Sequence, residues 1–559
     1  MKVMVRGKYI NLDKNAFVAQ GGEGTIYANG DTAYKIYTNP KKIIQPAKTQ
    51  ELSTLTLNNI IKPLDIITLN KQPVGYTMKF LKNTYPLCQL FTKAFRTRNT
   101  ISPDDILKLI IKLADIVKHV HEKGILIVDL NEMNFLVSND FKTPYAIDVD
   151  SYQTISFPTT AIMESIRDRH CGNKFSEGSD WFSFAIVTFQ LFAGIHPYRG
   201  KHPTIKDLDE RMKQNISVLN PNVSIPKACQ DFSIIPDKFI TWYKLVLEKG
   251  ERLQPPTDAT AGTTAIITKI SGSDNFTITT IKKYDGDQIL DFASINGTNF
   301  TLGTTGKNGW LHDNRKTNTT WNKLCLAIVP KTKDIIQAWT ENGSLKLHNI
   351  TRGMDIKTNL QADEIMTHDN VLYAKTTSLL VEIEYPIIKG LIMPVTKFIA
   401  GIMPNASKMF DGGVLQNMLG SVYAFLVPRQ GLCYQVRIQE LDGYRIIDAK
   451  LDRNVLVTIG FKNGKYDRLI HRFDDDFTTY DVKTAYDVDF HGINFVALDT
   501  GVCVIINEKE EIEIFSAQKD TTTNRLIIDP AIDNSMRLYK KGTKVLFTKG
   551  KTLYAIETK

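Results

Sequence analysis

The stretch VHEKGILIVDLNEMNFLV, residues 120–137, decides how the first half of the chain is to be understood. It runs from the end of a helical pattern into a short apolar strand, and Asp129 and Asn134 stand five residues apart in the turn between them. This spacing suits one group that orients a hydroxyl nucleophile and a second that reaches a divalent cation on the same phosphate chain. The stretch therefore predicts a site for phosphate chemistry.

The hairpin that follows, residues 137–153, ends its second strand with two acids. In VSNDFKTPYAIDVDSYQ these are Asp148 and Asp150. Side chains two residues apart on a strand share a face, so both carboxylates can point towards one cation. A solvated acidic turn is the alternative for an Asp-x-Asp taken by itself.

A glycine-rich hairpin stands near the start of the chain, in FVAQGGEGTIYANGDTAYKIY, residues 17–37. Its loop contains Gly21, Gly22 and Gly24, and the returning strand carries Lys35. Glycines let backbone amides approach phosphate oxygens closely, and the lysine supplies the compensating charge. Any glycine-rich hairpin looks similar, so this signal is weak when it is taken alone.

Residues 102–124, SPDDILKLIIKLADIVKHVHEKG, predict one long helix between these segments. Apolar residues recur at helical spacing behind the Ser102-Pro103 start. The helix delivers the chain into the turn that holds Asp129.

Taken together, these segments resemble the eukaryotic-like protein kinase family, and they follow in the family's order through the first 255 residues. Residues 120–137 look like its catalytic loop, with Asp129 on the catalytic aspartate and Asn134 on the magnesium-binding asparagine. QGGEGTIY looks like the glycine-rich loop, AYKIY like the V-A-I-K strand and IDVDSY like the D-F-G segment. The G-G-E-G-T opening and the D-x-D-S-[FY] form are closer to a divergent prokaryotic group of these kinases.

Three further matches fall in the expected large lobe. Residues 161–164 (Ala161-Ile162-Met163-Glu164) stand where the family has A-P-E. Within residues 178–200, the resemblance implies that Asp180 anchors the catalytic loop. It also makes Arg252, in EKGERLQPPTD, the expected partner of Glu164.

The resemblance implies a bilobal α+β domain over residues 1–255, with a small lobe over about 1–82 and a large lobe over about 83–255. ATP and Mg²⁺ are the implied cofactors. The residues implied for nucleotide binding are Gly21, Gly22, Gly24, Ile26, Lys35 and Glu51. Those implied for catalysis are Asp129, Lys35 and Asn134, and those implied for the metal are Asn134, Asp150 and Asp148. Glu51 is expected to brace Lys35, with Glu23 as its competitor, and the choice between Asp148 and Asp150 stays open.

Four positions depart from the family pattern. Ala19 replaces the first glycine of the loop, and Val128 replaces the arginine before the catalytic aspartate. Asn131 replaces the lysine two residues after that aspartate, and Tyr152 replaces the D-F-G glycine. The implied function is ATP-dependent phosphoryl transfer to a Ser or Thr hydroxyl of a protein. The alternative is a nucleotide-binding pseudokinase that acts as a scaffold or a regulated binding module.

After residue 255 the pattern changes from helical to β. Short runs rich in Thr, Ile, Val and aromatic residues alternate with Asn-Gly, Asp-Gly and Gly-Lys turns, which is typical of antiparallel hairpins. Seven strand-turn-strand units recur about 40 to 48 residues apart, with one shorter interval, and this predicts a seven-bladed β-propeller over residues 256–559. Because no WD or kelch signature is present, two packed sandwiches remain the alternative. A propeller is expected to sense a ligand or dock a substrate or partner.

Composition bounds the setting of a 559-residue chain that is 42% hydrophobic. Its six cysteines form no C-x-x-C pair, which indicates free thiols in a reducing compartment. The net charge of +9 resides mostly in the first 255 residues, where lysines are dispersed rather than clustered, so nucleic-acid binding is not expected. The opening residues lack the apolar stretch of a secretion signal, and no apolar run is long enough to cross a membrane. We expect a cytoplasmic protein without a structural metal.

Overall fold

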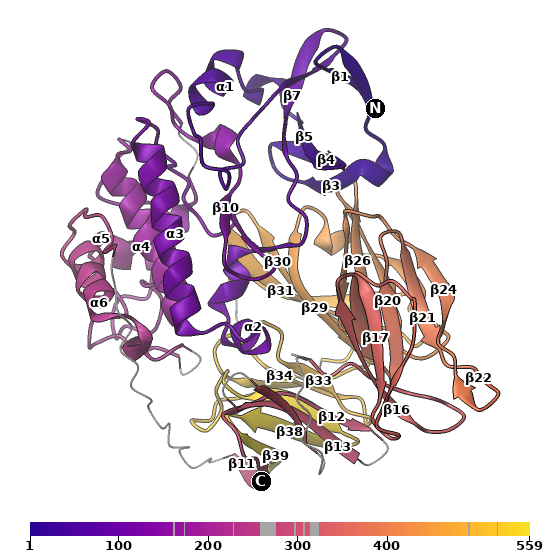
Figure 1. The fold of residues 1–559 in the computed structure, drawn as a ribbon. Helices are drawn as coiled ribbons and strands as arrows, with labels where there is room; N and C mark the ends of the chain where they lie inside the picture. Colours follow the sequence, from indigo (N-terminus) through magenta and orange to yellow (C-terminus); the bar gives the residue numbers. More distant parts are fainter. Residues whose placement is uncertain are drawn as a thin grey trace. The chain divides into compact units, whose positions relative to one another are not determined.

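The computed structural model describes residues 1–559 except 160–161, 173, 227–228, 258–274, 296–297, 306–307, 313–322, 490–491 and 523. It divides into two compact units (Figure 1). Described residues up to Thr257 belong to the first unit apart from 14–19, and those from Asn275 belong to the second apart from 489. Ala161, which the sequence placed in the A-P-E segment, lies outside the described residues.

One sheet forms the N-terminal part of the first unit, in the order β2-β1-β6-β7-β5-β4, with β3 next to β4; of β3, only Gln20 falls in this unit. Its strands are β1 (Lys2–Val5), β2 (Lys8–Asn11), β3 (Phe17–Gln20), β4 (Gly24–Asn29), β5 (Thr32–Tyr37), β6 (Ile66–Leu69) and β7 (Gln72–Lys79). The glycine-rich hairpin β4–β5 pairs Ile26 with Lys35, and β7 places Tyr76 opposite Lys35 on the other side. Lys35 therefore stands in the interior of this sheet.

Helices dominate the remainder of the first unit. They are α1 (Pro46–Leu52), α2 (Lys93–Arg98), α3 (Pro103–His121), α4 (Glu177–Ala193), α5 (Leu208–Lys213) and α6 (Asp237–Tyr243), the last continued by a π-helical turn over Lys244–Glu248. A small sheet in the order β10-β9-β8 contains β8 (Thr84–Pro86), β9 (Phe135–Ser138) and β10 (Pro144–Ala146). The loop between β9 and α3 carries Asp129, and the segment after β10 carries Asp148.

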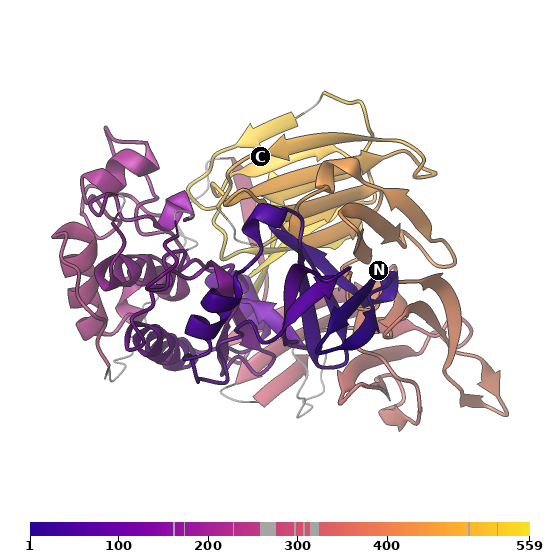
Figure 2. The same cartoon turned by 90° about the horizontal axis from the view of Figure 1, so that it is seen from above.

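The two long helices begin at sequence signals. The Ser102 hydroxyl accepts from the amide of Asp105, and the Asp105 carboxylate accepts from the amide of Ser102, so a capping box starts α3. Ser176 and Ser179 make the equivalent pair at α4, and Gly194, at φ 73°, ends that helix. α3 and α4 pack side by side (Figures 1 and 2), which brings Asp180 on α4 beneath the loop that follows α3.

The described residues of the second unit form seven antiparallel sheets of three or four strands, with a small hairpin, β22 (Ile387–Ile388) and β23 (Leu391–Ile392), inserted in one of them. The first sheet contains β12 (Gln288–Ile295), β13 (Thr298–Thr305) and β14 (Asn308–His312), and the second contains β15 (Leu326–Ile328), β16 (Ile335–Glu341), β17 (Ser344–Asn349) and β18 (Met354–Ile356). The third contains β19 (Glu364–His368), β20 (Val371–Lys375), β21 (Leu379–Glu384) and β24 (Val395–Gly401), and the fourth contains β25 (Ser407–Phe410), β26 (Gly413–Met418), β27 (Ser421–Leu426) and β28 (Tyr434–Arg437). The fifth contains β29 (Arg445–Asp452), β30 (Val455–Lys462), β31 (Lys465–Phe473) and β32 (Tyr480–Ala485). The last two are β33 (Phe495–Ala497), β34 (Val502–Ile506), β35 (Ile512–Ser516) and β36 (Asn524–Ile527); and β37 (Arg537–Lys541), β38 (Lys544–Lys549) and β39 (Thr552–Thr558) together with β11 (Phe276–Lys283). The final sheet thus joins β11, the first strand described after residue 257, to β37, β38 and β39.

A separate hydrophobic cluster fills the space between each sheet and the next. Leu302 and Leu326, for example, belong to the cluster between the β12–β14 sheet and the β15–β18 sheet. Each later pair of successive sheets also encloses such a cluster. The last in this series contains Val504 of the β33–β36 sheet and Phe547 of the final sheet. A last cluster, which includes Leu553 and Phe292, returns from the final sheet to the β12–β14 sheet. The seven interfaces therefore form a closed cycle.

Candidate active site

The ammonium of Lys35 lies between the two acids that the sequence placed near it. Its Nζ is 2.8 Å from Oδ1 of Asp148 and 2.7 Å from Oδ2 of Asp150, and only 6% of the lysine side chain is exposed. Burial alone would lower the pKa of Lys35, but the attraction of Asp150 and Asp148 raises that pKa above its usual value. The lysine is therefore a fixed cation.

Asp150 is fully occupied by its neighbours. Besides Lys35, its carboxylate accepts hydrogen bonds from the hydroxyls of Tyr37 and Tyr76, each at 2.6 Å, and its side chain is 3% exposed. Burial by itself would raise the pKa of Asp150, yet Lys35 and the two hydroxyls hold it below its usual value. Both oxygens of this ionised carboxylate are engaged, so it has little capacity for a metal ion.

Asp148 is the acid that remains available. Its backbone lies in the left-handed region (φ 60°, ψ 33°), and 38% of its side chain is exposed. Only one of its oxygens contacts Lys35, and the second accepts no hydrogen bond from any described residue. Of the two acids, Asp148 has the geometry of a ligand.

The loop after α3 holds Asp129 and Asn134 together. The Nδ2 of Asn134 donates to the backbone carbonyl of Asp129 at 2.9 Å, and Oδ1 of Asp129 accepts from the amide of Met163 at 2.8 Å. Burial raises the pKa of Asp129 above its usual value, and the bond from Met163 opposes that rise. Because Asn134 uses its amide nitrogen in the loop, its Oδ1 is left for another partner.

Asp180 fixes this loop from below, as the resemblance implied. Its carboxylate accepts from the amides of Ile127 at 2.8 Å and Val128 at 2.9 Å, and from Nε2 of His121 at 2.9 Å. Val128 is a β-branched residue at φ 63°, a conformation that costs about 1–3 kcal/mol. The buried Asp180 stabilises this strained turn and so sets the direction of Asp129.

The donor set fits a magnesium ion that arrives on a phosphate chain. Among the described residues, no group of three or more His, Cys, Asp or Glu side chains could hold a metal by itself. Asp148 and Asn134 nevertheless offer hard oxygen atoms, and Mg²⁺ in proteins commonly takes one or two such ligands and completes its shell with water and phosphate oxygens. The residues present therefore fit Mg²⁺ bound together with a nucleotide.

The glycine-rich loop divides into two parts. A Cβ on Gly24 would lie 2.6 Å from the carbonyl oxygen of Ile36, so the close pairing of β4 and β5 requires glycine there. Gly22 has no atom within 4 Å of its would-be Cβ, and Gly21 has only one, at 4.0 Å. Glu23 turns to Lys42, 2.6 Å away, and not to Lys35. Gly21 and Gly22 therefore leave the loop open to a ligand.

Glu51 does not brace Lys35. It lies on α1, where its carboxylate accepts from the amide of Ser156 at 3.4 Å. The place beside Lys35 is already filled by Asp150. The predicted pairing is wrong for that reason.

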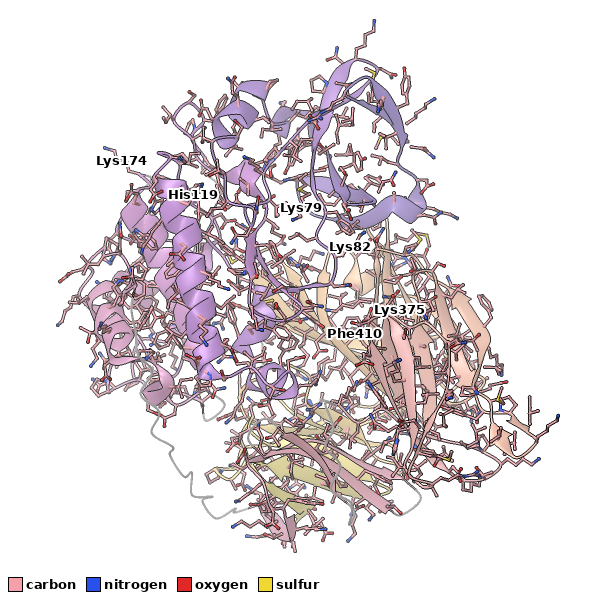
Figure 3. All side chains as sticks on the ribbon, in the orientation of Figure 1. Lys79, Lys82, His119, Lys174, Lys375 and Phe410 are labelled. Carbon is pink, nitrogen blue, oxygen red and sulfur yellow. The ribbon has the colours of Figure 1, made fainter. Side chains whose placement is uncertain are left out.

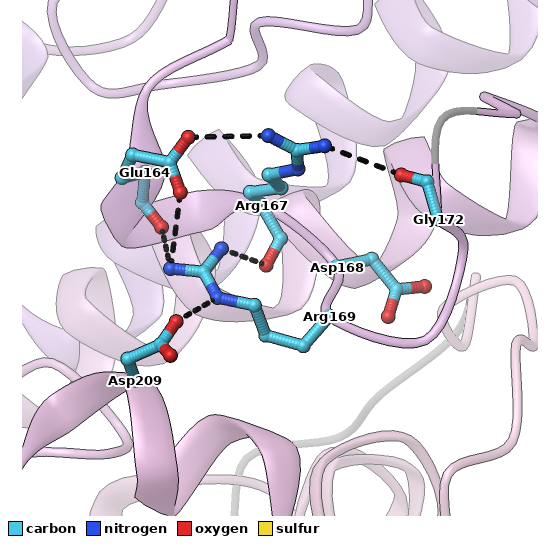
Figure 4. Close-up of a pocket in the computed structure, with 6 residues that line it drawn as sticks. All are labelled: Glu164, Arg167, Asp168, Arg169, Gly172 and Asp209. Atoms are coloured by element: carbon cyan, nitrogen blue, oxygen red, sulfur yellow. Dashed lines mark hydrogen bonds and ion pairs between the residues drawn. The ribbon is translucent and has the colours of Figure 1, made fainter.

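Arg252 pairs with Asp168 and not with Glu164. The guanidinium makes two bonds of 2.6 Å to the Asp168 carboxylate, which is 3% exposed. Glu164 is 69% exposed and contacts Arg167 and Arg169 at the rim of a pocket of about 310 Å³ (Figure 4). Asp168 thus takes the role of Arg252 partner that was predicted for Glu164.

Two of the departures have structural roles. Oδ1 of Asn131 accepts from the amides of Met133 and Asn134, so the side chain closes the loop and supplies no cation. Tyr152 is buried, 1% exposed, behind the segment that carries Asp148.

The residues that sequence reasoning missed are Tyr37 and Tyr76. Tyr37 stands two residues after Lys35 and so shares its strand face, which is a signal that AYKIY already contained. Tyr76 could be found only from strand pairing. The histidines of α3 do not share a site: His121 bonds Asp180, whereas His119 (Figure 3) accepts from the amide of Thr56 at 3.1 Å.

Comparison with known proteins relates this part of the chain to kinases. Over 223 residues the chain is 25% identical to protein kinase YegI of Escherichia coli K12, which covers 36% of this chain and 34% of that protein. Over 235 residues it is 26% identical to a probable LIM domain-containing serine/threonine-protein kinase of Dictyostelium discoideum, covering 35% of each. The chain thus spans about a third of the length of the curated relatives it matches. No family model matches the chain. These similarities support a kinase-like region in a largely β protein.

Proposed function

We propose that the first unit is an ATP-dependent protein kinase that transfers a phosphoryl group to a Ser or Thr hydroxyl. The observation that carries this proposal is the convergence of the Lys35 ammonium with Asp148, on a segment more than a hundred residues away. Asp129 and Asn134 lie on the loop immediately before the hairpin that leads to Asp148, and the amide of Ile147 bonds the carbonyl of Asn134 at 2.9 Å. A cation, a carboxylate with one open oxygen and a half-buried proton acceptor are the parts that phosphoryl transfer needs.

Each residue has a distinct part in this chemistry. Lys35 holds the negative charge of the nucleotide phosphates, and Gly21 and Gly22 let the loop backbone approach them. Asp148 and Asn134 hold Mg²⁺, which neutralises charge on the phosphates when it is bound. Asp129 orients the acceptor hydroxyl and accepts its proton, and burial makes that carboxylate a stronger base.

A nucleotide-binding pseudokinase is the second candidate, and position 131 favours it. The side chain of Asn131 is committed to the loop, and its neutral amide supplies no cation for the transferring group. Positioned cations supply much of the rate in phosphoryl transfer. Retention of Lys35, Asp129 and Asn134 favours the enzyme.

Incorporation of label from [γ-³²P]ATP with Mg²⁺ separates the two candidates. We expect the purified full chain to label itself or a general Ser/Thr substrate, and Asp129→Asn to label about a hundredfold more slowly, as for a lost general base. Acid-stable phosphoserine or phosphothreonine in the product would support the acceptor class. Equal labelling by the parent and by Asp129→Asn would contradict the enzyme and leave the pseudokinase.

We also infer that the second unit is a seven-bladed β-propeller that docks a substrate or partner. The support is the closed cycle of hydrophobic clusters together with the final sheet, in which β11 pairs with β39 over seven residue pairs. Two packed sandwiches would bury one core between each pair of sheets and would not need seven successive interfaces.

We propose the cytoplasm as the site of action. The six cysteines are free, which suits a reducing compartment. Among the described residues, no helix is both long enough and apolar enough to cross a membrane.

A further inference from the structure

Three side chains on one face of the N-terminal sheet converge on a single carboxylate. Lys35 and Tyr37 are two residues apart on β5, and Tyr76 is the direct partner of Lys35 on β7. All three donate to Asp150, at 2.7, 2.6 and 2.6 Å. A buried acid held by three donors is a constructed site and not a chance contact.

These contacts fix the direction in which the Lys35 side chain points. The two tyrosine rings also flank the ammonium, because Nζ of Lys35 lies 5.3 Å from the centre of the Tyr37 ring and 5.7 Å from that of the Tyr76 ring. With Asp150 on its buried side and the partly exposed Asp148 on the other, the ammonium cannot swing back into the sheet. It is presented towards the side on which Asp148 is open.

Helix α1 contributes a cation to this arrangement and not a carboxylate. Nζ of Lys48 donates to the backbone carbonyl of Asp150 at 2.7 Å. No described carboxylate forms an ion pair with Lys48, and Glu51, on the same helix, bonds the amide of Ser156 instead. The helix therefore touches the backbone of the acid that holds Lys35, and does not touch Lys35 through an acid of its own.

We propose that Asp150 is the positioning residue for Lys35, supported by Tyr37 and Tyr76, and that Lys48 fastens α1 to it through the Asp150 carbonyl. This rests on the proposed function and deepens it. The acid that directs the lysine and the acid that faces the metal then belong to one three-residue segment, 148–150. Alignment of the phosphate-binding lysine is set by that segment, and the carboxylate of α1 is dispensable.

The test is ATP binding to the full chain, measured by calorimetry in EDTA and again in Mg²⁺. It asks whether Asp150 positions Lys35 while Asp148 binds the metal. Without metal, Asp150→Asn leaves Lys35 with Asp148 alone and draws it off the phosphates, so we expect affinity for ATP to fall about tenfold. Asp148→Asn keeps the Lys35–Asp150 pair, so we expect its main effect to be loss of the gain in affinity that Mg²⁺ gives the parent. Glu51→Gln is the matched control and should behave as the parent in both conditions.

Two milder variants keep the test valid if Asp150→Asn fails to fold. Tyr37→Phe and Tyr76→Phe each remove one hydroxyl from Asp150 and keep the ring, so we expect a smaller loss of metal-free ATP binding in each and a larger loss in the double variant. A second readout is the rate at which an amine-reactive reagent acylates Lys35, followed by mass spectrometry. Asp150→Asn should raise that rate at Lys35 without raising it at Lys62, whose Nζ donates to the carbonyls of Ser53 and Leu55 and would be freed by global unfolding.

The outcomes separate this inference from the proposed function. If Asp150→Asn binds metal-free ATP as the parent does, or if Glu51→Gln loses that binding, Asp150 does not position Lys35. If the binding pattern holds but the parent transfers no phosphate, the positioning is correct and the kinase activity is not.

Discussion

At the scale of single residues, the Arg252–Asp168 pair links the end of the first unit to the segment before α4. Removing one partner of a buried pair leaves an uncompensated charge. We therefore expect Asp168→Ala to lower the free energy of unfolding of the first unit by about 3 kcal/mol. Glu164→Ala, at a 69% exposed side chain, should cost less than about 1 kcal/mol. Urea denaturation of the full chain, followed by tryptophan fluorescence, measures both.

The reverse ranking of those two variants would restore Glu164 as the structural partner of Arg252. A double-mutant cycle with Arg252→Ala gives the coupling directly, and we expect it to be large for Asp168 and near zero for Glu164.

His196 makes the stability of the first unit depend on pH. Its Nε2 lies 2.8 Å from the carbonyl of Ser165, and its Nδ1 accepts from the amide of Tyr198, so the ring is held in one neutral tautomer. Burial lowers its pKa to about 3 from an ordinary value of 6.5. Between these values the unfolded chain binds a proton that the folded chain excludes, so stability is full above pH 6.5 and falls as the pH drops.

The slope assigned to His196 is at most about 1.4 kcal/mol per pH unit. His196→Asn should lose stability less steeply than the parent between pH 6.5 and 4.5 in urea titrations. Parallel pH profiles for parent and variant would show that the histidine is not the proton-linked group.

At the scale of elements, the β5–β7 pairing is the tightest part of the site. A Cβ on Gly75 would lie 1.8 Å from the carbonyl oxygen of Lys35, which only a backbone shift can relieve. We expect Gly75→Ala to cost about 2 kcal/mol or more and, because Tyr76 and Lys35 must separate, to weaken ATP binding as well. Gly22→Ala meets no atom within 4 Å and should leave the melting temperature unchanged.

A Gly75→Ala variant that melts and binds ATP as the parent does would mean that the two strands can move apart freely. Calorimetric melting and ATP titration on the same samples decide this.

The same elements show what a sequence can foretell. Ser102-Pro103 and the period of residues 102–124 fix α3, because capping and amphipathic spacing are local properties. The nearness of Lys35 to Asp148 and Asp150 came from family resemblance, since no local rule joins residues more than a hundred positions apart. The predicted pairing of Glu51 with Lys35 was wrong for a related reason. Which acid reaches the lysine depends on how α1 packs, and spacing along the chain does not encode that packing.

At the scale of the whole molecule, the seven sheets of the second unit were foreseen in number from the recurrence of hairpins. A closed propeller was predicted from that number, but the strands that close it were not named, because closure depends on β11 pairing with β39 across the full length of the unit. Loose repeats specify each sheet locally, whereas the seam is a single long-range contact. The proposed propeller is therefore most vulnerable at that seam.

Deletion of residues 552–559, which removes β39, tests the seam. β39 lies between β11 and β38, and Leu553 and Ile556 belong to the two clusters that flank this sheet. Without it, β11 loses its strand partner, two neighbouring clusters lose side chains and two strand edges are exposed, so we expect rapid proteolysis and aggregation of the second unit. Deletion of Lys559 alone removes one exposed residue beyond the strand and should change neither property. Limited proteolysis with mass spectrometry distinguishes the units, and a second unit that resists protease as well as the parent would mean that its sheets hold together without a closed ring.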